Sequence, residues 1–455
     1  ERMTITYRID VADAHAHLFR VTLRVPRPAA EQRLSLPVWI PGSYLVREFA
    51  RHLSEVRATQ GGEPVALQQL DKASWVASCS GRAELVVSAL VYAFDTSVRA
   101  AFLDASRGFF NGTGLCLRVE GREAEPHRIQ TGTLPRGWQV ATAMRPVKVD
   151  AAGRGLYEAA DYDELVDHPF ELGTFWRGSF DAHGVPHVFV VAGALPDFDG
   201  ERLLADAQRI CEAQIAFWHG TGKKARAPMG RYVFLLNTAE DGHGGLEHRA
   251  STALLSARRN LPQRGRAETS DNYADLLGLI SHEYFHTWNV KRLRPAEFAR
   301  YDYEQENYTE LLWFFEGFTS YYDDLALLRD QSGPQVTLML MGDSGDQRRI
   351  AIAKYSDEGV PNALSPMRLP IHLPEARVRT TSDKFIQGAT LGQPGKNFYQ
   401  VNFELTNTST RTLDAAQFVT QLLRTLTQFF FFNENNESKK MATVSVAVIS
   451  GAKFA

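Results

Sequence analysis

Apolar and polar residues alternate along the first third of the chain. This period of two appears in MTITYRID, FRVTLRV and AELVVSALVYAF, and it is typical of strands that bury one face. Turn-forming residues separate these segments, for example IPGS at 40–43 and QGGEP at 60–64. The region has no regular alternation of strands and helices and no glycine-rich nucleotide-binding loop. Residues 1–165 are therefore predicted to form a mainly antiparallel β domain.

The hydrophobic pattern changes after residue 165. The apolar segments HVFVVAG (187–193) and RYVFLLN (231–237) predict buried strands, because each is short and rich in β-branched or aromatic residues. Between them, residues 201–220 have apolar positions at helical spacing. Strands next to a long helix indicate an α+β domain.

Two longer apolar helices follow these strands. We expect the first at 270–290, with its N-cap at Ser270 or Asp271, because Ser and Asp accept hydrogen bonds from a helix's first N–H groups. We expect the second at 307–330, beginning at Asn307. Both complete the predicted α+β domain.

The last part of the chain has the least regular pattern. It contains the apolar segment TLMLMG, to which the pattern assigns no element. Strands are predicted near NFYQVNFELTNTS and at TVSVAVIS, and a helix around AAQFVTQLLRTLTQ. No motif in this part carries chemistry. The whole chain is predicted to be a multidomain α+β protein with domains at 1–165, 166–333 and 334–455, the last without a defined fold.

Composition and charge exclude several classes of protein. Of the 455 residues, 44% are hydrophobic and 23% are charged, which is ordinary for a globular chain. The formal net charge of −3 gives no general attraction to nucleic acid or to an anionic membrane, and there is no apolar run of about 18 residues. Cys79, Cys116 and Cys211 form no CxxC pair, so neither a disulfide scaffold nor a thiolate zinc site is predicted. We expect a cytoplasmic protein, or a periplasmic one if a leader has been removed.

The segment HEYFH at 282–286 carries the main chemical signal. His282 and His286 are four residues apart, so on a helix they share one face and can reach the same metal ion. Zinc suits two neutral imidazoles and a carboxylate, with its fourth position left to water. Glu283 is rotated by about 100° from His282 around the helix, where it can act as a general base on that water. The motif predicts one zinc ion per chain and metal-assisted hydrolysis of a carbonyl.

The same HExxH pattern also arises by chance, as a histidine pair on a solvated helix face. The preceding segment ADLLGLI is strongly apolar and places the motif on a buried helix. Buried imidazoles and a buried carboxylate need polar partners, because an unpaired polar group is costly in an apolar environment. A metal ion with a third protein ligand meets that need.

Several glutamates downstream compete for the role of third ligand. Glu306 has the spacing of thermolysin-like enzymes in its favour, since 19 residues separate it from His286. We prefer Glu316, which lies among aromatic residues where a carboxylate is costly unless it meets a cation. An ion pair of Glu316 with Arg292 or Arg294 is the alternative. The other competing glutamates, in the polar stretch before Glu316, are Glu304 and Glu310.

The segment DGHGGLEH at 241–248 follows the predicted strand at 231–237. Gly244 and Gly245 would let the edge of a strand lie close to the backbone of a ligand. Glu247 on such an edge could bind the free α-ammonium group of a peptide. Read without its context, the segment is a glycine-rich loop and Glu247 an exposed acid.

Three motifs in this order resemble the M61 glycyl aminopeptidase family, relatives of the M1 (aminopeptidase N-type) gluzincins. They are GGLEH, HEYFHTWNVKRLRP and LLWFFEGFTSYYDDLALLR. The segments LPVWIPGSYLVREFARH and FLDASRGFFNGTGLCLRVEG are similar to that family's β domain, so the resemblance covers about residues 5–332.

The resemblance implies a β-rich domain followed by a thermolysin-like catalytic domain, in a zinc enzyme that removes N-terminal residues from peptides with a free N-terminus. It also implies a preference for Gly and Ala as the residue removed. By motif position, His282, His286 and Glu316 fall on the zinc ligands and Glu283 falls on the general base. Glu247 falls on the glutamate that binds the substrate amine.

The chain departs from the family after about residue 333. The family continues with a helical region whose Tyr stabilises the oxyanion, and it usually ends in a PDZ-like domain. Tyr355 is the nearest candidate here, but its surroundings do not match. Two alternatives therefore stay open: a thermolysin-like endopeptidase with Glu306 as ligand, and a binding protein that keeps the metallopeptidase fold without catalysis.

Overall fold

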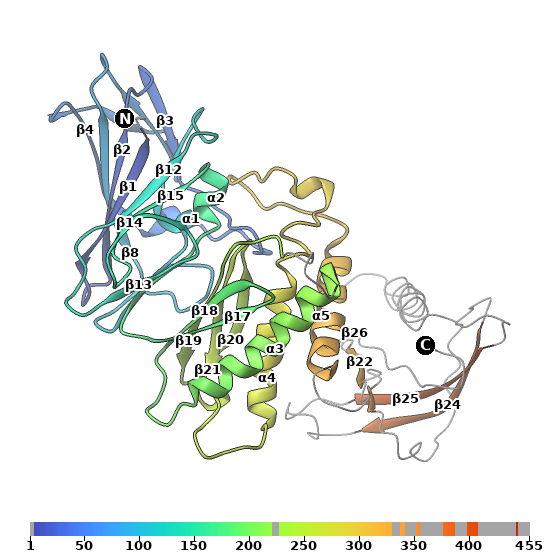
Figure 1. The fold of residues 1–455 in the computed structure, drawn as a ribbon. Coiled ribbons are helices and arrows are strands. Elements are labelled where there is room, and N and C mark those ends of the chain that lie inside the picture. The colour runs from blue at the N-terminus through green and yellow to red at the C-terminus, as the bar shows by residue number, and fades with distance from the viewer. Residues whose placement is uncertain are drawn as a thin grey trace. The chain divides into compact units, whose positions relative to one another are not determined.

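The computed structural model describes residues 4–220 and 227–329, and beyond them only five strands. The chain forms two compact units, Glu1–Leu311 and Leu312–Ala455. Figure 1 shows the order of the elements along the chain. The predicted domain limits at 165 and 333 stay predictions.

The largest sheet of the first unit has eight strands. They are β1 (Ile5–Asp13), β2 (Leu18–Val25), β4 (Leu53–Gln60), β5 (Glu63–Pro64), β8 (Leu85–Tyr92), β12 (His127–Thr131), β14 (Arg145–Val149) and β15 (Gly155–Ala159). Their order in the sheet is β14-β15-β12-β1-β2-β8-β4-β5. All neighbours are antiparallel except β1 and β12. The predicted N-terminal β domain is confirmed.

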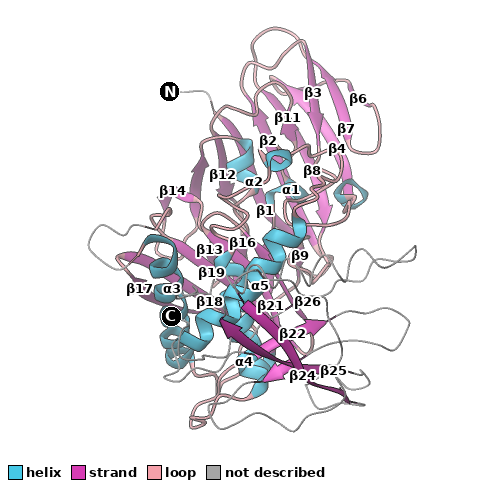
Figure 2. Cartoon of the chain, turned by 90° about the vertical axis from the view of Figure 1, so that its right-hand side faces the viewer, coloured by secondary structure: helices cyan, strands magenta, loops and turns pink. Residues whose placement is uncertain are grey.

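Two four-stranded antiparallel sheets complete this β region (Figure 2). One contains β13 (Gln139–Ala141), β16 (Phe170–Gly173), β10 (Arg107–Phe110) and β9 (Phe102–Leu103). The other contains β11 (Arg118–Val119), β3 (Glu31–Ser35), β7 (Ser74–Ser78) and β6 (Leu67–Gln69). The short helices are η1 (Phe49–His52), α1 (Gly112–Leu115) and α2 (Tyr162–Val166).

The alternation in the sequence explains how these strands pack. In β2, the residues Phe19, Val21, Leu23 and Val25 are all buried, while the intervening Arg20 and Arg24 are exposed. Successive side chains of a strand point to opposite faces, so this pattern gives one apolar and one polar face. The apolar faces meet in one core.

A five-stranded sheet follows the β region. Its strands are β17 (Trp176–Ala182), β18 (Val185–Ala192), β19 (Tyr232–Ala239), β20 (His243–Glu247) and β21 (Ser251–Ala257). Their order is β17-β18-β19-β21-β20. The three central strands are parallel, and β17 and β20 are antiparallel edge strands. Both strands predicted from apolar runs, β18 and β19, are confirmed.

Both faces of this sheet are covered, as expected for parallel strands. On one face, Val190, Val233 and Leu235 belong to the core of the N-terminal β region. On the other face, α3 (Gly200–His219) contacts β17, and α4 (Asp271–Phe285) contacts β20 and β21 (Figure 1). The first unit also contains η2 (Arg258–Asn260) and η3 (Ala296–Phe298).

The second unit contains α5 (Leu312–Arg329) and the strands β22 (Thr337–Met341), β23 (Ile352–Lys354), β24 (Ala376–Ile386), β25 (Phe398–Asn407) and β26 (Thr443–Val444). The strand predicted near NFYQVNFELTNTS is confirmed as β25, and the segment TLMLM forms β22. Of TVSVAVIS only β26 is described, and the helix predicted around AAQFVTQLLRTLTQ lies outside the described residues. None of the helices in the described part of the chain combines the length and hydropathy of a membrane-crossing segment.

Two predicted helix limits were wrong. The helix predicted from Asn307 begins at Leu312, because Asn307 closes a loop instead: its Oδ1 accepts from the N–H of Asp302 at 2.8 Å, and its Nδ2 donates to the Asp302 carbonyl at 2.8 Å. The helix predicted to reach residue 290 ends at Phe285. There the backbone tightens, and the N–H of Thr287 donates to the carbonyl of Tyr284 at 3.0 Å.

Candidate active site

Helix α4 holds the HExxH motif in a fixed orientation. Ser270 is its N-cap, as predicted, and its hydroxyl accepts from the N–H of Tyr273 at 3.2 Å. Apolar residues at helical spacing, Leu276, Ile280 and Tyr284, are fully buried. They determine which face of the helix carries His282, Glu283 and His286.

The imidazoles of the motif converge. His286 is 2% exposed, and its Nδ1 lies 2.7 Å from the carbonyl oxygen of Asn289. A carbonyl only accepts, so Nδ1 carries the hydrogen and Nε2 is left with its lone pair. That Nε2 lies 3.1 Å from Nε2 of His282. A histidine oriented through its other nitrogen by a backbone carbonyl is the usual arrangement of a metal ligand.

Two acidic residues meet His286. Glu247, at the end of β20, is 9% exposed, and Glu283 is 5% exposed. One carboxylate oxygen of each and one imidazole nitrogen of His286 lie within 4.8 Å of one another. Two buried carboxylates this close repel each other unless a cation or a proton lies near them. The structure thus brings Glu247 to the HExxH motif, although 34 residues separate it from His282.

Gly245 of β20 lies directly against the Glu283 side chain of α4. A Cβ at this position would lie 2.0 Å from Oε1 of Glu283, so any larger residue would have to displace the Glu283 side chain. At the neighbouring Gly244, a Cβ would meet nothing within 4 Å. The structure places Gly245 against Glu283, and the expected close approach of both glycines to the backbone of a ligand stays a prediction.

A loop of the N-terminal β region reaches the same place, which the sequence did not predict. Gly42 has φ +86°, and a Cβ there would lie 2.6 Å from Leu246 Cδ1 and 2.9 Å from both carboxylate oxygens of Glu247. The only signal in the sequence was the turn IPGS. The loop at 40–43 therefore packs against the side chain of Glu247.

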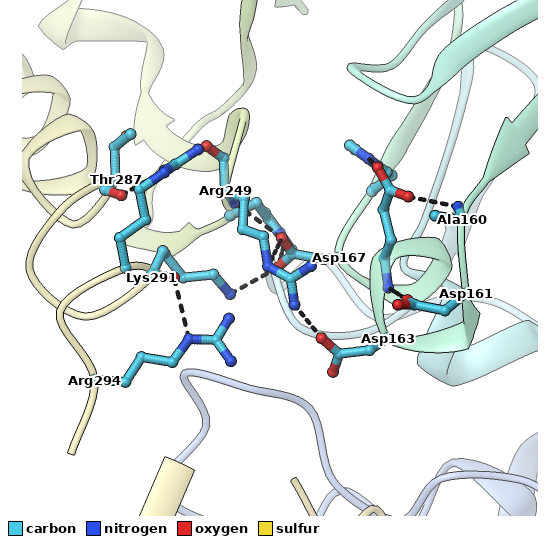
Figure 3. Close-up of polar contacts among 12 residues, drawn as sticks. Ala160, Asp161, Asp163, Asp167, Arg249, Thr287, Lys291 and Arg294 are labelled. Atoms are coloured by element: carbon cyan, nitrogen blue, oxygen red, sulfur yellow. Dashed lines mark hydrogen bonds and ion pairs between the residues drawn. The ribbon is translucent and has the colours of Figure 1, made fainter. Parts of the chain in front are cut away.

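Asp167 directly follows α2 in the N-terminal β region. Its contacts connect that region to the segment after Glu247 and to the segment after His286 (Figure 3). Its Oδ1 lies 2.6 Å from Nζ of Lys291 and 3.4 Å from Nδ1 of His248, and its Oδ2 accepts from the N–H of Arg249 at 3.0 Å. His248 directly follows Glu247, and Lys291 lies five residues after His286. The Arg249 guanidinium also pairs with Asp163.

Asp167 and Lys291 each shift the pKa of the other toward its charged form. Burial alone would raise the pKa of Asp167, but the Lys291 ammonium, His248 and Arg249 together outweigh burial and hold that pKa well below its usual value. Burial alone would lower the pKa of Lys291, but Asp167, with smaller contributions from Tyr301 and Glu247, more than compensates, so that the pKa is raised. For His248 burial dominates and lowers the pKa. Near neutral pH the cluster therefore consists of an ionised Asp–Lys pair beside a neutral imidazole.

The glutamates that competed for the third ligand lie in different surroundings. Glu306 Oε1 accepts from the N–H of Val46 at 3.1 Å, and Glu304 pairs with Arg118. Glu310 is exposed. Glu316 is half-buried on α5, which belongs to the second unit, and its role as a ligand stays a prediction.

The arginines considered as partners of Glu316 bond to backbone carbonyls. Arg292 Nη1 donates to Thr287 at 2.6 Å and to Arg249 at 3.0 Å. Arg294 Nε donates to Lys291 at 3.1 Å.

A cavity of about 560 Å³ lies at the carboxyl ends of β18 and β19. Asn237, Thr238, Arg258 and Arg264 are among its lining residues. None of the predicted site residues lines it, so it is separate from the converging side chains described above.

Comparison with known families agrees with this architecture. The model of the Peptidase M61 N-terminal domain matches residues 6–174, and that of the M61 glycyl aminopeptidase matches residues 275–339. The second match contains the HExxH motif and α5. The chain belongs to the M61 peptidase family.

Solved structures were compared as well. An aminopeptidase N family protein from Idiomarina loihiensis is 42% identical, with a TM-score of 0.69 over 72% of this chain and 55% of its own. This chain therefore spans little more than half the length of that protein. An M1 zinc metallopeptidase from Deinococcus radiodurans is 14% identical, with a TM-score of 0.40 over 72% of this chain and 70% of its own. A search of curated proteins gives no match.

Proposed function

We propose that this protein is a zinc-dependent aminopeptidase that hydrolyses the N-terminal residue of peptides, with Gly and Ala preferred. Its catalytic domain would be thermolysin-like and would follow the N-terminal β domain. The observation that carries the proposal is the meeting of Glu247 with Glu283 and His286, whose ligand-type atoms lie within 4.8 Å. An amine-binding carboxylate beside a general base limits cleavage to the first peptide bond.

The residues fit a zinc ion. The Nε2 atoms of His282 and His286 are 3.1 Å apart, and the Nδ1 of His286 is held by a carbonyl. We propose Glu316 as the third ligand, on the sequence argument that a carboxylate among aromatic residues needs a cation. Bound zinc would supply a Lewis acid that polarises a peptide carbonyl and acidifies water.

The chain's own residues would perform the remaining steps. Glu247 binds the substrate ammonium and fixes the position of the first carbonyl. Glu283 takes a proton from the attacking water and returns it to the leaving amine. Gly245 keeps β20 close enough to Glu283 for the carbonyl and the base to meet, and the outer edge of β20 can pair with the substrate backbone.

Hydrolysis of Gly- and Ala-p-nitroanilide tests the proposal. We expect release that stops with a chelator and returns with zinc, and that falls about 10²- to 10⁴-fold in Glu283→Gln, the usual contribution of a general base. Glu268→Gln is the matched control, because Glu268 is exposed. His286→Ala should lose bound zinc, measured as metal content.

N-acetylated substrates separate the proposal from its rivals. Acetylation removes the charge that Glu247 binds and should abolish hydrolysis. Hydrolysis of acetylated peptides at an undiminished rate would indicate an endopeptidase. A folded, zinc-loaded chain that hydrolyses neither substrate would be a binding protein and not an enzyme.

A further inference from the structure

Arg47 and Arg99 bring two guanidinium groups from the N-terminal β region towards β20. Arg99 Nη2 donates to the carbonyl oxygen of Gly245 at 3.4 Å, and Arg47 Nε donates to Ser43 Oγ at 2.8 Å. Both side chains are half-buried. Ser43 directly follows Gly42, which packs against Glu247, so both arginines come from the surroundings of the proposed amine site.

No carboxylate of the described residues pairs with either guanidinium group. Within 4.0 Å, Arg107 has Glu171 and Arg249 has Asp163 and Asp167, but neither Arg47 nor Arg99 forms such an ion pair in the described ranges. The Nε of Arg99 is buried and has no hydrogen-bond partner there. Burial first, and then the charge of Arg99, lower the pKa of Arg47, and the charge of Asp95, which forms no ion pair with it within 4.0 Å, offsets part of this lowering. Two such guanidinium groups favour an anion.

The position along the strand indicates which anion. Arg99 meets β20 at Gly245, two residues from Glu247, and two residues of a strand span about 6–7 Å. A peptide held at Glu247 by its ammonium and extended along this edge covers about 3.3–3.6 Å per residue. Its second or third residue would therefore reach Arg99. A carboxylate is the anion that a peptide carries there, and an arginine fork fits it with two hydrogen bonds.

We propose that Arg99, assisted by Arg47, binds a carboxylate of a short peptide substrate two to three residues from its ammonium. The substrates would be di- and tripeptides with a free carboxylate, held at both ends between Glu247 and Arg99. This inference rests on the aminopeptidase function proposed above and names the substrate class of that site. The carboxylate can be the C-terminus or an acidic side chain at the second position.

Matched substrates test the proposal. Gly-Gly carries a terminal carboxylate, Gly-Asp-NH₂ carries one on its side chain, and Gly-Gly-NH₂ carries neither. We expect kcat/KM for a carboxylate substrate to exceed that for Gly-Gly-NH₂ by about ten- to a hundredfold, as for a hydrogen bond to a charged group. A preference for Gly-Gly assigns the C-terminus, and a preference for Gly-Asp-NH₂ assigns the side chain.

Arg99→Gln should bring this ratio close to one through KM, and Arg99→Lys should restore part of it by keeping the charge. Arg57→Gln is the control, because the Arg57 side chain is 75% exposed, and it should keep the wild-type ratio. Equal rates on all three substrates for the wild-type protein would overturn the proposal. So would an equal loss on all three in Arg99→Gln, which would make Arg99 a residue that only positions β20.

A binding measurement keeps this test separate from catalysis. Gly-p-nitroanilide has no carboxylate, so its hydrolysis tests the aminopeptidase function alone. Calorimetric titration of the zinc-loaded Glu283→Gln protein with Gly-Gly and Gly-Gly-NH₂ needs no turnover. Tighter binding of Gly-Gly, lost when Arg99→Gln is added, supports the carboxylate site even if hydrolysis fails. Equal binding of the two peptides contradicts it.

Discussion

Replacing Asp167 by Asn should destabilise the first unit, and it should do so more than replacing Lys291 by Met. The two side chains are 5% and 2% exposed and form an ion pair at 2.6 Å. In Asp167→Asn, the Lys291 ammonium stays buried and loses the one carboxylate among the described residues that pairs with it within 4.0 Å. In Lys291→Met, the Asp167 carboxylate still accepts a hydrogen bond from the backbone N–H of Arg249 at 3.0 Å. It also keeps its ion pair with the Arg249 side chain, whose Nε lies at 3.5 Å.

The magnitude follows from the cost of a broken buried pair, about 3–5 kcal/mol when one charge loses its partner. We expect Asp167→Asn to reach this range and Lys291→Met to cost about 2–3 kcal/mol, because Arg249 compensates in part. The unit Glu1–Leu311 should unfold with an entropy of about 0.65 kcal/mol/K, from about 2.1 cal/mol/K per residue. The expected decreases in Tm are therefore about 5–8 °C and about 3–5 °C.

Calorimetry of both variants and of Asp167→Asn/Lys291→Met measures these shifts. Removing both charges leaves neither group unpaired, so the double variant should be more stable than the sum of the single changes implies, with a coupling of about 1–3 kcal/mol. Additive single changes, or a Tm unchanged in Asp167→Asn, would refute the reasoning.

The dependence of Tm on pH also tests the contribution of the Asp167–Lys291 ion pair. The pKa of Asp167 is lowered in the folded state, so its contribution is present above the unfolded value of about 4 and is lost as the pH falls through the folded value. The pKa of Lys291 is raised, so its contribution is present below about 10.4 and is lost as the pH rises further. Between pH 4 and 2, the Tm of Asp167→Asn should therefore fall less steeply than that of the wild-type protein.

Other substitutions test the close contacts around the site. Gly245→Ala should abolish peptide hydrolysis, because its Cβ would lie 2.0 Å from Glu283 Oε1. Gly244→Ala is the matched control, because a Cβ there would meet nothing within 4 Å. This control should stay folded and hydrolyse peptides faster than Gly245→Ala. Gly42→Ala should raise KM and lower Tm, because the residue has φ +86° and its Cβ would press on the Glu247 carboxylate, which we propose binds the substrate amine; an unchanged KM would contradict that proposal. Ser270→Ala removes the N-cap of α4 and should cost about 1 kcal/mol in denaturant unfolding, with Ser270→Asp keeping the cap; equal stability of the two variants would argue against it.

Local patterns in the sequence determined much of this protein. The alternation in β2 and the apolar runs of β18 and β19 predicted strands, because the period of side chains and their burial are properties of the strand itself. The i, i+4 spacing of His282 and His286 placed both imidazoles on one helix face for the same reason. Where local hydrogen bonds compete, the pattern was not enough: Asn307 has the chemistry of an N-cap but closes a loop with Asp302.

Only the tertiary structure decided what meets these elements. Asp167 lies 81 residues before His248 and 124 before Lys291, and nothing in its local sequence marks it as their partner. Gly42 and Arg99 likewise reach Glu247 and Gly245 from loops of the N-terminal β region. A contact between distant segments depends on how sheets and helices pack against one another. The local sequence around each residue does not specify that packing. The sequence therefore determined the chemistry of the HExxH motif, whereas packing determined which charges surround it.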